Sequence, residues 1–242
     1  MAFKHGRKAA VWYQGLNLSP YLTSAELAAT GDVSDVSTFG DDWRRQLAGL
    51  LGATLSAEGW FDPALTALDT DLGAGATLIT YCPGGAAAVG DPARMLSVID
   101  TAYGRSNNTD GPVAFSLEAL ADAYVAIGFV LHPLGEDTNT TTGASRDGAA
   151  ASATGWTAQL HVTAVDAGSW VVKLQDSADN SSWSDVSGGA FAAKTAAGAE
   201  QIRSAGATTA LRRYVRYVAT RTGGTTGDGI TFGLSISRTN QS

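Results

Sequence analysis

The side chains that most often carry out chemistry are few and widely spaced in this 242-residue chain. The three histidines, His5, His132 and His161, are separated by 127 and 29 residues, and none belongs to an HxH or HxxxH pair. We therefore expect surface histidines and neither metal ligands nor catalytic bases. Cys82 is the single cysteine, which excludes an intrachain disulfide, and the strand-like residues 78–81 before it favour a buried, inert thiol.

Paired carboxylates occur, but only at neighbouring positions of polar segments. They are Asp41 with Asp42, Asp69 with Asp71, and Glu136 with Asp137. General acid–base catalysis needs two carboxylates facing each other across a cleft in different environments, whereas these positions indicate a solvated surface. The chain also contains no GxSxG elbow, Walker A motif or dinucleotide-binding glycine pattern. We predict a protein that is not an enzyme, with no catalytic residue, cofactor or metal.

Three further patterns have a binding interpretation and a simpler structural one. The segment 176–180 (DSADN) is similar to a calcium loop, but it lacks the glycine and distal glutamate of an EF-hand, so a hairpin turn is favoured. The basic cluster in residues 212–221 lies in a half with little net charge, which makes duplex binding a weak expectation. Aromatic residues nearby could form a sugar platform, although their inward positions favour core packing.

Charge divides the chain into two halves. Residues 1–137 carry 16 Asp/Glu against 7 Lys/Arg, a net of −9, and residues 138–242 carry 7 against 9, a net of +2. A Thr/Gly/Ala/Ser-rich stretch over 138–155 lies at the junction. We therefore expect a first domain over 1–137, a flexible linker over 138–155 and a second domain over 156–242. This organisation suits a structural building block with an appended module.

The hydropathy pattern gives no sign of export or of a membrane span. No apolar run approaches the roughly 20 residues that cross a bilayer. The apolar run 9–13 that follows the basic N-terminus is too short for a signal peptide. We expect a protein that is made and used without passing through a membrane.

The first half is patterned mainly as strands. Alternation predicts strands over 8–18 (with a turn at Gln14-Gly15), 53–61, 77–82, 95–103, 113–121 and 125–131. One helix is predicted to begin at Asp62-Pro63, an N-cap followed by proline, and to end near Gly73. A hairpin turn is expected at Gly31-Asp32, and residues 39–51 fit either a short helix or a loop lying on another subunit. The half is therefore predicted to be a β-sandwich or partial barrel with one helix.

The second half alternates in the same way. Trp156, Trp170 and Val215 mark the inward faces of three strands, and Ile230, Phe232, Leu234 and Ile236 form a fourth, with polar residues between them. Short strands separated by Gly/Asp/Asn turns predict an all-β sandwich, Ig-like or jelly-roll-like.

The first half resembles the tail tube proteins of long-tailed bacteriophages, particularly those that infect actinobacteria. The resemblance depends on an ordered set of segments: FKHGRKAAVW (3–12), GLNLSPYL (15–22), STFG (37–40), TLSAEGWFD (54–62) and TYCP (80–83). The second half resembles the β-sandwich appended to many such proteins, through VKLQDSADNSSW (172–183) and RYVR (213–216).

This resemblance implies a mechanism and a location. Six copies would form a ring around a channel, and rings would stack into the tube of a long, flexible, non-contractile tail. The tube would hold the tape measure protein, pass DNA during ejection, and meet the tail terminator and distal tail proteins. An acidic lumen would repel DNA phosphates and would fit the charge of the first half. The protein would be assembled in the host cytoplasm and reside in the virion.

The resemblance also assigns an interface between rings to the loop that begins near Phe39. Trp43 would be its apolar anchor, Asp41, Asp42, Arg44 and Arg45 would be polar contacts, and the basic arm with Lys4 and Lys8 would reach an acidic neighbour.

Two other classes of protein stay open at this point. One is a two-domain carbohydrate-binding surface protein, and the other is a different structural component of a phage tail or head. Binding of host glycans by the second half is compatible with either class and with the tube.

Overall fold

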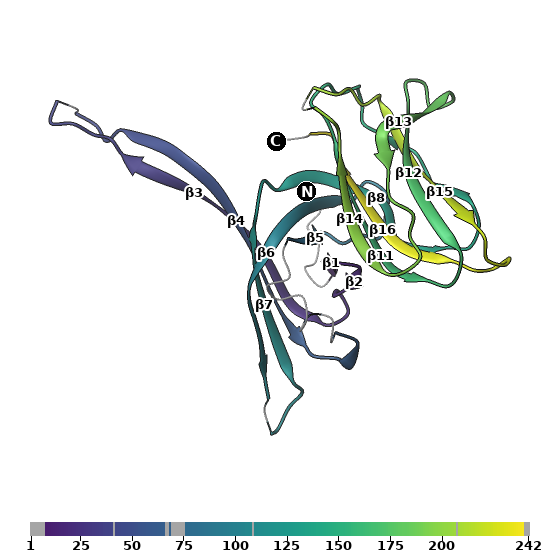
Figure 1. Ribbon diagram of the computed structural model, residues 1–242. Helices are drawn as coiled ribbons and strands as arrows, with labels where there is room; N and C mark the ends of the chain where they lie inside the picture. Colours follow the sequence, from purple (N-terminus) through teal and green to yellow (C-terminus); the bar gives the residue numbers. More distant parts are fainter. Residues whose placement is uncertain are drawn as a thin grey trace. The chain divides into compact units, whose positions relative to one another are not determined.

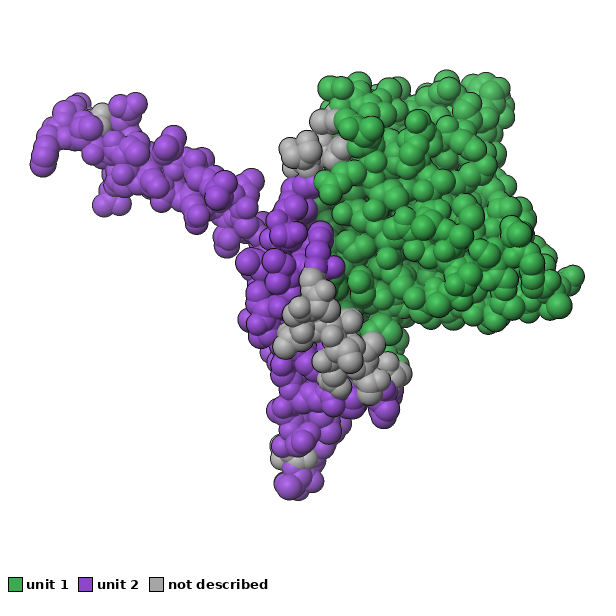
Figure 2. All heavy atoms as spheres, viewed as in Figure 1, with its two compact units in different colours: residues 1–21, 77–96, 126–242 green, residues 22–76, 97–125 purple. Residues whose placement is uncertain are grey.

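The computed structural model describes residues 8–40, 42–65, 68, 76–107, 109–206 and 208–239, and these residues are mainly β-strands. The chain forms two compact units (Figure 2): unit 1 comprises residues 1–21, 77–96 and 126–242, and unit 2 comprises residues 22–76 and 97–125. The prediction of a mainly-β fold is confirmed.

Unit 1 contains most of the strands in Figure 1. They are β1 (Ala10–Tyr13), β2 (Leu16–Asn17), β5 (Thr77–Cys82), the start of β6 (Pro92–Ser106), β8 (Ala126–Asp137), β9 (Thr141–Thr142), β10 (Arg146–Asp147), β11 (Thr157–Val165), β12 (Ser169–Ser177), β13 (Trp183–Ala190), β14 (Gly198–Arg203), β15 (Tyr214–Thr222) and β16 (Ile230–Ser237). The predicted turn between the first two strands is present, with Gln14 and Gly15 at positive φ. Gly15 is required there because a Cβ would lie 2.6 Å from the Gly198 nitrogen.

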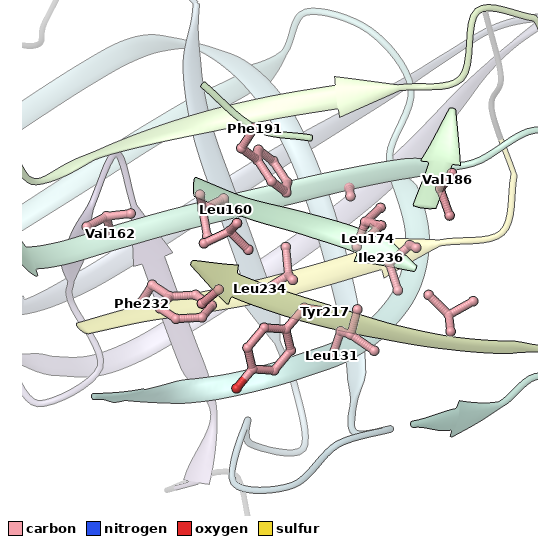
Figure 3. Packing of buried hydrophobic residues seen from close by; sticks show 14 of the residues in the cluster. Leu131, Leu160, Val162, Leu174, Val186, Phe191, Tyr217, Phe232, Leu234 and Ile236 are labelled. Atoms are coloured by element: carbon pink, nitrogen blue, oxygen red, sulfur yellow. The ribbon is translucent and has the colours of Figure 1, made fainter. Parts of the chain in front are cut away.

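Two sheets of unit 1 pack face to face. One has the order β14-β11-β16-β8 and the other has the order β10-β15-β12-β13, with β9 also paired to β15. Their facing side chains form one apolar core that includes Trp156, Trp170 and Phe232, and Figure 3 shows Leu160, Leu174, Tyr217 and Leu234 within it. The predicted inward faces of these strands, and the sandwich itself, are therefore present.

The second face of β11 and β16 is also buried, which the alternation did not predict. Gln159, His161, Ser235 and Ser237 were expected to point to solvent, but all four are buried. The reason is a further layer made by β1 and β5. A Cβ at Gly233 would lie 2.7 Å from the Trp12 ring, so glycine is what lets Trp12 pack closely against β16.

The expected boundary at residue 137 differs from the division that the structure shows. β8 lies in the same sheet as β16, with Asp137 opposite Ile230, so residues 126–137 belong with the second half of the chain. The expected flexible linker over 138–155 contains β9 and β10, both paired with β15. The physical reason is that hydrogen bonds join strands far apart in sequence, and composition cannot show which strands they join.

Unit 2 is an antiparallel sheet with the order β3-β4-β7-β6. Its elements are β3 (Leu22–Asp35), β4 (Gln46–Trp60), β7 (Ala114–Ala121), residues 97–106 of β6, and the 3-10 turn η2 (Pro63–Leu65). The predicted alternation in β4 and β7 is confirmed, because Ala53, Leu55 and Ala57 are buried together with Phe115, Leu117 and Ala119.

The region between residues 22 and 51 corrects two expectations. β3 continues through Gly31 and Asp32, where we expected a turn, and the chain reverses instead at residues 36–45. Residues 46–51 begin β4 and are not helical. Gly31 and Asp32 mark a register shift, at which Gly31 faces Leu51 and Val33 faces Ala48. Gly31 and Asp32 therefore lie at a β-bulge in a continuous ladder. Bulges and turns favour the same residue types, which is why a turn was expected here.

The predicted helix after Asp62 is described only in part. Leu65 donates its backbone N–H to the Asp62 carbonyl at 2.8 Å, closing the 3-10 turn, and Leu68 is helical and buried. The rest of the predicted helix, including Leu72 and Gly73, lies outside the described residues.

Candidate assembly interface

The tip of the β3–β4 hairpin carries most of the residues predicted to form an interface. Phe39, Asp42, Trp43, Arg44 and Arg45 all lie in the reversal at 36–45 and are all exposed. Phe39 has a relative exposure of 114% and Trp43 one of 84%, which is unusual for large apolar side chains. The hairpin therefore presents the predicted aromatic anchor to solvent.

The other three predicted residues are not part of this tip. Asp41 and Lys4 lie outside the described residues. Lys8 is exposed and belongs to unit 1, whereas the tip belongs to unit 2.

The tip is an ordered turn whose backbone is hydrogen-bonded at its base. Val36 donates its N–H to the Arg45 carbonyl at 2.9 Å, and Arg45 donates its own N–H to the Ser37 hydroxyl at 2.8 Å. Ser37 in turn donates its N–H to the Asp35 carboxylate at 2.9 Å, and the hydrogen bonds from Ser37 hold the pKa of that carboxyl below its usual value. These hydrogen bonds close the end of the hairpin from which the exposed aromatic side chains project.

The loop expected to lie on another subunit, residues 39–51, extends beyond the tip, and exposed apolar side chains continue along the hairpin. We call apolar ribbon the exposed apolar side chains at the base of the tip and in the strands next to it, namely Val33, Val36, Leu47, Leu50 and Leu51. Leu51 lies on the same face of β4 as the buried Leu55, because the two are an even number of residues apart. Leu47 lies beyond the bulge, opposite Ser34, and points to the other face. Apolar side chains therefore occur on both faces of the hairpin. A two-stranded ribbon cannot bury both of its faces by itself.

The outward face of the unit 2 sheet is acidic. Glu26 of β3, Glu58 of β4 and Glu118 of β7 are exposed at alternating positions, on the side opposite the buried Leu55 and Leu117. Serines separate these charges across the strands, since Ser56 faces both Glu26 and Glu118. We call this set the acidic face. It avoids placing like charges directly opposite each other, which would destabilise the sheet.

Charge follows the structural units more sharply than the sequence halves. Unit 2 contains 13 Asp/Glu and 3 Lys/Arg, a formal net of −10, and unit 1 contains 10 and 13, a net of +3. Arg105 is the single basic residue in the strands of the unit 2 sheet, and its guanidinium lies 3.7 Å from the centre of the Phe61 ring. The strands of unit 2 are thus almost entirely acidic where they are charged.

Two strands form the margins of the unit 2 sheet. Within this unit β3 is paired with β4, and β6 is paired with β7 over Val98–Ser106. Each neighbouring pair is antiparallel, so β3 and β6 run in opposite directions at the two margins. A sheet with long outer strands of opposite direction can continue into another copy of itself without breaking the antiparallel order.

His132 and His161 do not form a site together, and their environment differs from the one expected, whereas His5 lies outside the described residues. His161 is completely buried, and burial lowers its pKa to about 3. Its Nε2 lies 3.0 Å from the Thr80 hydroxyl, which donates to Gln159 Oε1 at 2.6 Å. His132 is half-buried, stacked on Phe232 with ring centres 4.3 Å apart, and burial lowers its pKa too. Surface exposure was therefore the wrong expectation for both residues, because a second layer covers His161 on β11 and His132 on β8 packs against Phe232 and Tyr217.

Cys82 is buried as predicted, and burial raises the pKa of its thiol to about 12. Such a thiol stays protonated and unreactive at neutral pH. Among residues 8–239 as far as the structure describes them, no three His, Cys, Asp or Glu side chains are grouped so that they could hold a metal ion. Within the same described residues, no helix has the length and apolar character needed to cross a membrane.

The basic cluster and the DSADN segment both have structural roles. Arg213 forms an ion pair with Asp147 at 2.7 Å, and Arg216 lies over the Trp183 ring at 4.1 Å while donating to Gln175. The Asp179 carboxylate accepts the N–H groups of Ser181 and Ser182, which closes the hairpin turn favoured by the sequence.

No protein-family model matches the sequence, and a search of curated proteins finds no match. Among solved structures, the chain is similar to a protein in the virion of a native gene transfer agent, with 15% identity, a TM-score of 0.43, and coverage of 52% of this chain and 98% of that one. It is similar to the tail tube of SPP1, with 10% identity, a TM-score of 0.42, and coverage of 51% and 78%.

A third similarity is to the SPP1 Dit protein, described as part of a hub adsorption apparatus in phages that infect Gram-positive bacteria. It has 12% identity, a TM-score of 0.34, and coverage of 95% of this chain and 98% of that one. TM-scores this low do not establish a common function. The function is therefore argued from the surfaces of this chain.

Proposed function

We propose that this protein is a structural subunit of a phage tail tube, which polymerises as rings stacked into a hollow cylinder. The observation that carries the proposal is the pair of outer strands in unit 2. Rotation about an axis along the strands would bring β3 of one copy beside β6 of the next in antiparallel orientation, and every copy could repeat the contact until the ring closes. Closure would also remove two sheet margins that are otherwise prone to uncontrolled association.

The acidic face supports a channel for nucleic acid. If the sheets form the wall of a ring, one face of each sheet is directed to its axis, and we assign that role to the part of the acidic face around Glu26 and Glu118, which face each other across Ser56. A negative wall repels phosphates, so DNA would slide through without adhering. The tape measure protein would occupy the same channel before ejection, and tail terminator and distal tail proteins would meet the two ends of the tube.

The apolar ribbon and the tip support the stacking of rings. Exposed side chains such as Trp43 and Leu51 are costly in a monomer and become favourable when a neighbouring copy covers them. We assign this contact to the next ring, with six copies per ring as the resemblance of the sequence implies. The location would then be the tail of a virion, with assembly in the host cytoplasm and a long, non-contractile tail.

A carbohydrate-binding surface protein is less well supported. A sugar platform needs an open aromatic face, and one face of Trp183 is covered by Arg216, which Gln175 holds in place. Host glycans are a second candidate ligand of unit 1, and a binding measurement with the purified protein decides whether they bind. A different tail or head component would be distinguished by its lower copy number in the particle.

Electron microscopy of the purified full-length protein tests the proposal. We expect wild-type protein to form rings and hollow tubes as its concentration rises, and Trp43→Ala to form rings but few or short tubes. Sedimentation velocity gives the size distribution of each sample. A wild-type protein that stays monomeric up to its solubility limit, or binds a glycan as a monomer, would contradict the proposal.

A further inference from the structure

We infer that the tip of the β3–β4 hairpin docks into a hollow at the opposite end of the same sheet in another copy of this chain. The inference deepens the proposed function, on which it rests, by naming the surface that receives the tip. The hollow has a volume of about 440 Å³ and is lined by residues from all four strands of unit 2: Thr23, Glu58, Gly59, Trp60, Gly104, Arg105, Ser106, Ala114, Phe115 and Ser116.

The two features lie at opposite ends of the same strands. Tip residues precede Gln46, where β4 begins, and the hollow includes Trp60, where β4 ends. The 15 residues of β4 would span about 46 Å at a rise of about 3.3 Å per residue. In Figure 1 the hairpin extends away from the end of the sheet at which β6 and β7 are joined. A tip at one end and a hollow at the other define a head-to-tail contact, which repeats along a line of copies.

The size of the hollow fits an aromatic side chain, and one of its lining residues is itself aromatic and exposed. That residue is Trp60, which is half-exposed and lies opposite Ala114 in the sheet. A space of this size suits a compact group such as the indole of Trp43 or the ring of Phe39, both of which are exposed in their own copy. Aromatic anchors that fill a pocket on a partner contribute most strongly to association.

The charges of the tip and of the hollow are also complementary. The tip carries Arg44 and Arg45 beside Trp43, and the hollow carries the exposed carboxylate of Glu58. Arg105 also borders the hollow, but it pairs with the buried Phe115, so its guanidinium belongs to the other face of the sheet, where it lies 3.7 Å from the centre of the Phe61 ring. Attraction between the two tip arginines and the Glu58 carboxylate would fix the orientation of the tip and disfavour a shifted one.

A charge exchange tests this contact. We expect the tip variant Arg44→Glu/Arg45→Glu and the hollow variant Glu58→Lys each to raise the concentration needed for tubes about tenfold, because like charges would then face each other. Combining the three substitutions in one chain should restore tubes. Glu118→Lys is the matched control, since Glu118 lies on the same face but outside the hollow, and it should leave polymerisation unchanged.

The outcomes separate this inference from the proposed function. Wild-type tubes with no effect of Glu58→Lys, an equal effect of Glu118→Lys, or no rescue in the combined variant would overturn the tip-in-hollow contact and leave the tube standing. Absence of wild-type tubes would overturn both. Thermal unfolding checks the fold of each variant, and Ser106→Arg, which fills the hollow from β6, replaces Glu58→Lys if that variant does not fold.

Discussion

Strand β16 of unit 1 and the distal β3–β4 hairpin of unit 2 present apolar side chains in opposite circumstances. In β16, Phe232 and Leu234 face one buried core, and Gly233 and Ser235 face a second layer, so nearly the whole strand is out of water. In the hairpin, Leu47 and Leu51 are exposed and no layer of unit 2 covers them among the described residues. Equal hydropathy therefore gives a scaffold in one place and a surface for association in the other.

The largest expected effect comes from removing the strands that surround β8. A chain that ends after Asp137 would lose β11 and β16, and with them the surface on which Trp12 packs and the sheet neighbour of β8. We expect no cooperative unfolding transition for unit 1 in this fragment when it is followed by circular dichroism in denaturant. A transition at the midpoint of the full-length protein would show that residues 1–137 fold independently.

Two tryptophan substitutions compare the regions directly. Trp170→Ala removes a completely buried indole from the sandwich core and should lower the free energy of unfolding by about 3–5 kcal/mol. Trp43→Ala removes an exposed indole and should change it by less than about 0.5 kcal/mol, while tube formation is impaired. Urea denaturation gives both values. Equal losses of stability would mean that the tip is packed within the monomer.

A smaller effect should appear in the dependence of stability on pH. His161 has a pKa of about 3 in the folded chain, against about 6.5 when it is unfolded, so below pH 6.5 the unfolded state binds a proton that the folded state does not. The contribution of His161 to the free energy of unfolding is therefore fully present above pH 6.5. It falls on acidification by at most about 1.4 kcal/mol per pH unit.

His161→Gln should flatten this dependence between pH 6.5 and 4.5, in addition to its constant cost for the core. His132→Asn is the control, because the pKa of His132 is also lowered by burial but Asp137 partly offsets the shift. Urea denaturation at three pH values measures the slopes. A slope for His161→Gln that equals the wild-type slope would show that His161 is accessible to protons in the folded chain.

Alternation predicted single strands well and their surroundings poorly. Ala53, Leu55 and Ala57, and likewise Trp156, Ala158 and Leu160, are buried as the period of two requires. The same pattern placed His161 and Ser235 in solvent, because a period of two identifies two faces of a strand without indicating how many are covered. Gly31-Asp32 was misassigned because bulges and turns favour the same residues.

At the candidate interface, too, individual residues were predicted better than their surroundings. Trp43 was assigned as an apolar anchor through the family resemblance; the structure shows that it is exposed, and its role in a contact stays a prediction. Residues 39–51 were predicted to form either a short helix or a loop on another subunit, because spacing alone does not reveal the register that leaves Leu50 and Leu51 without a core. The hollow with Glu58 and Trp60 could not be found from the sequence, because it joins residues of four strands up to 93 positions apart, from Thr23 to Ser116.

The sequence by itself determined the mainly-β class, most of the strand positions, the isolated buried thiol, and the acidic character of the first half. The tertiary structure decided which strands became neighbours, and hence that residues 126–137 join the second half and that charge separates into units of −10 and +3. The physical reason is that side-chain periodicity is set by each strand's own backbone, whereas pairing depends on hydrogen bonds and packing between segments distant along the chain.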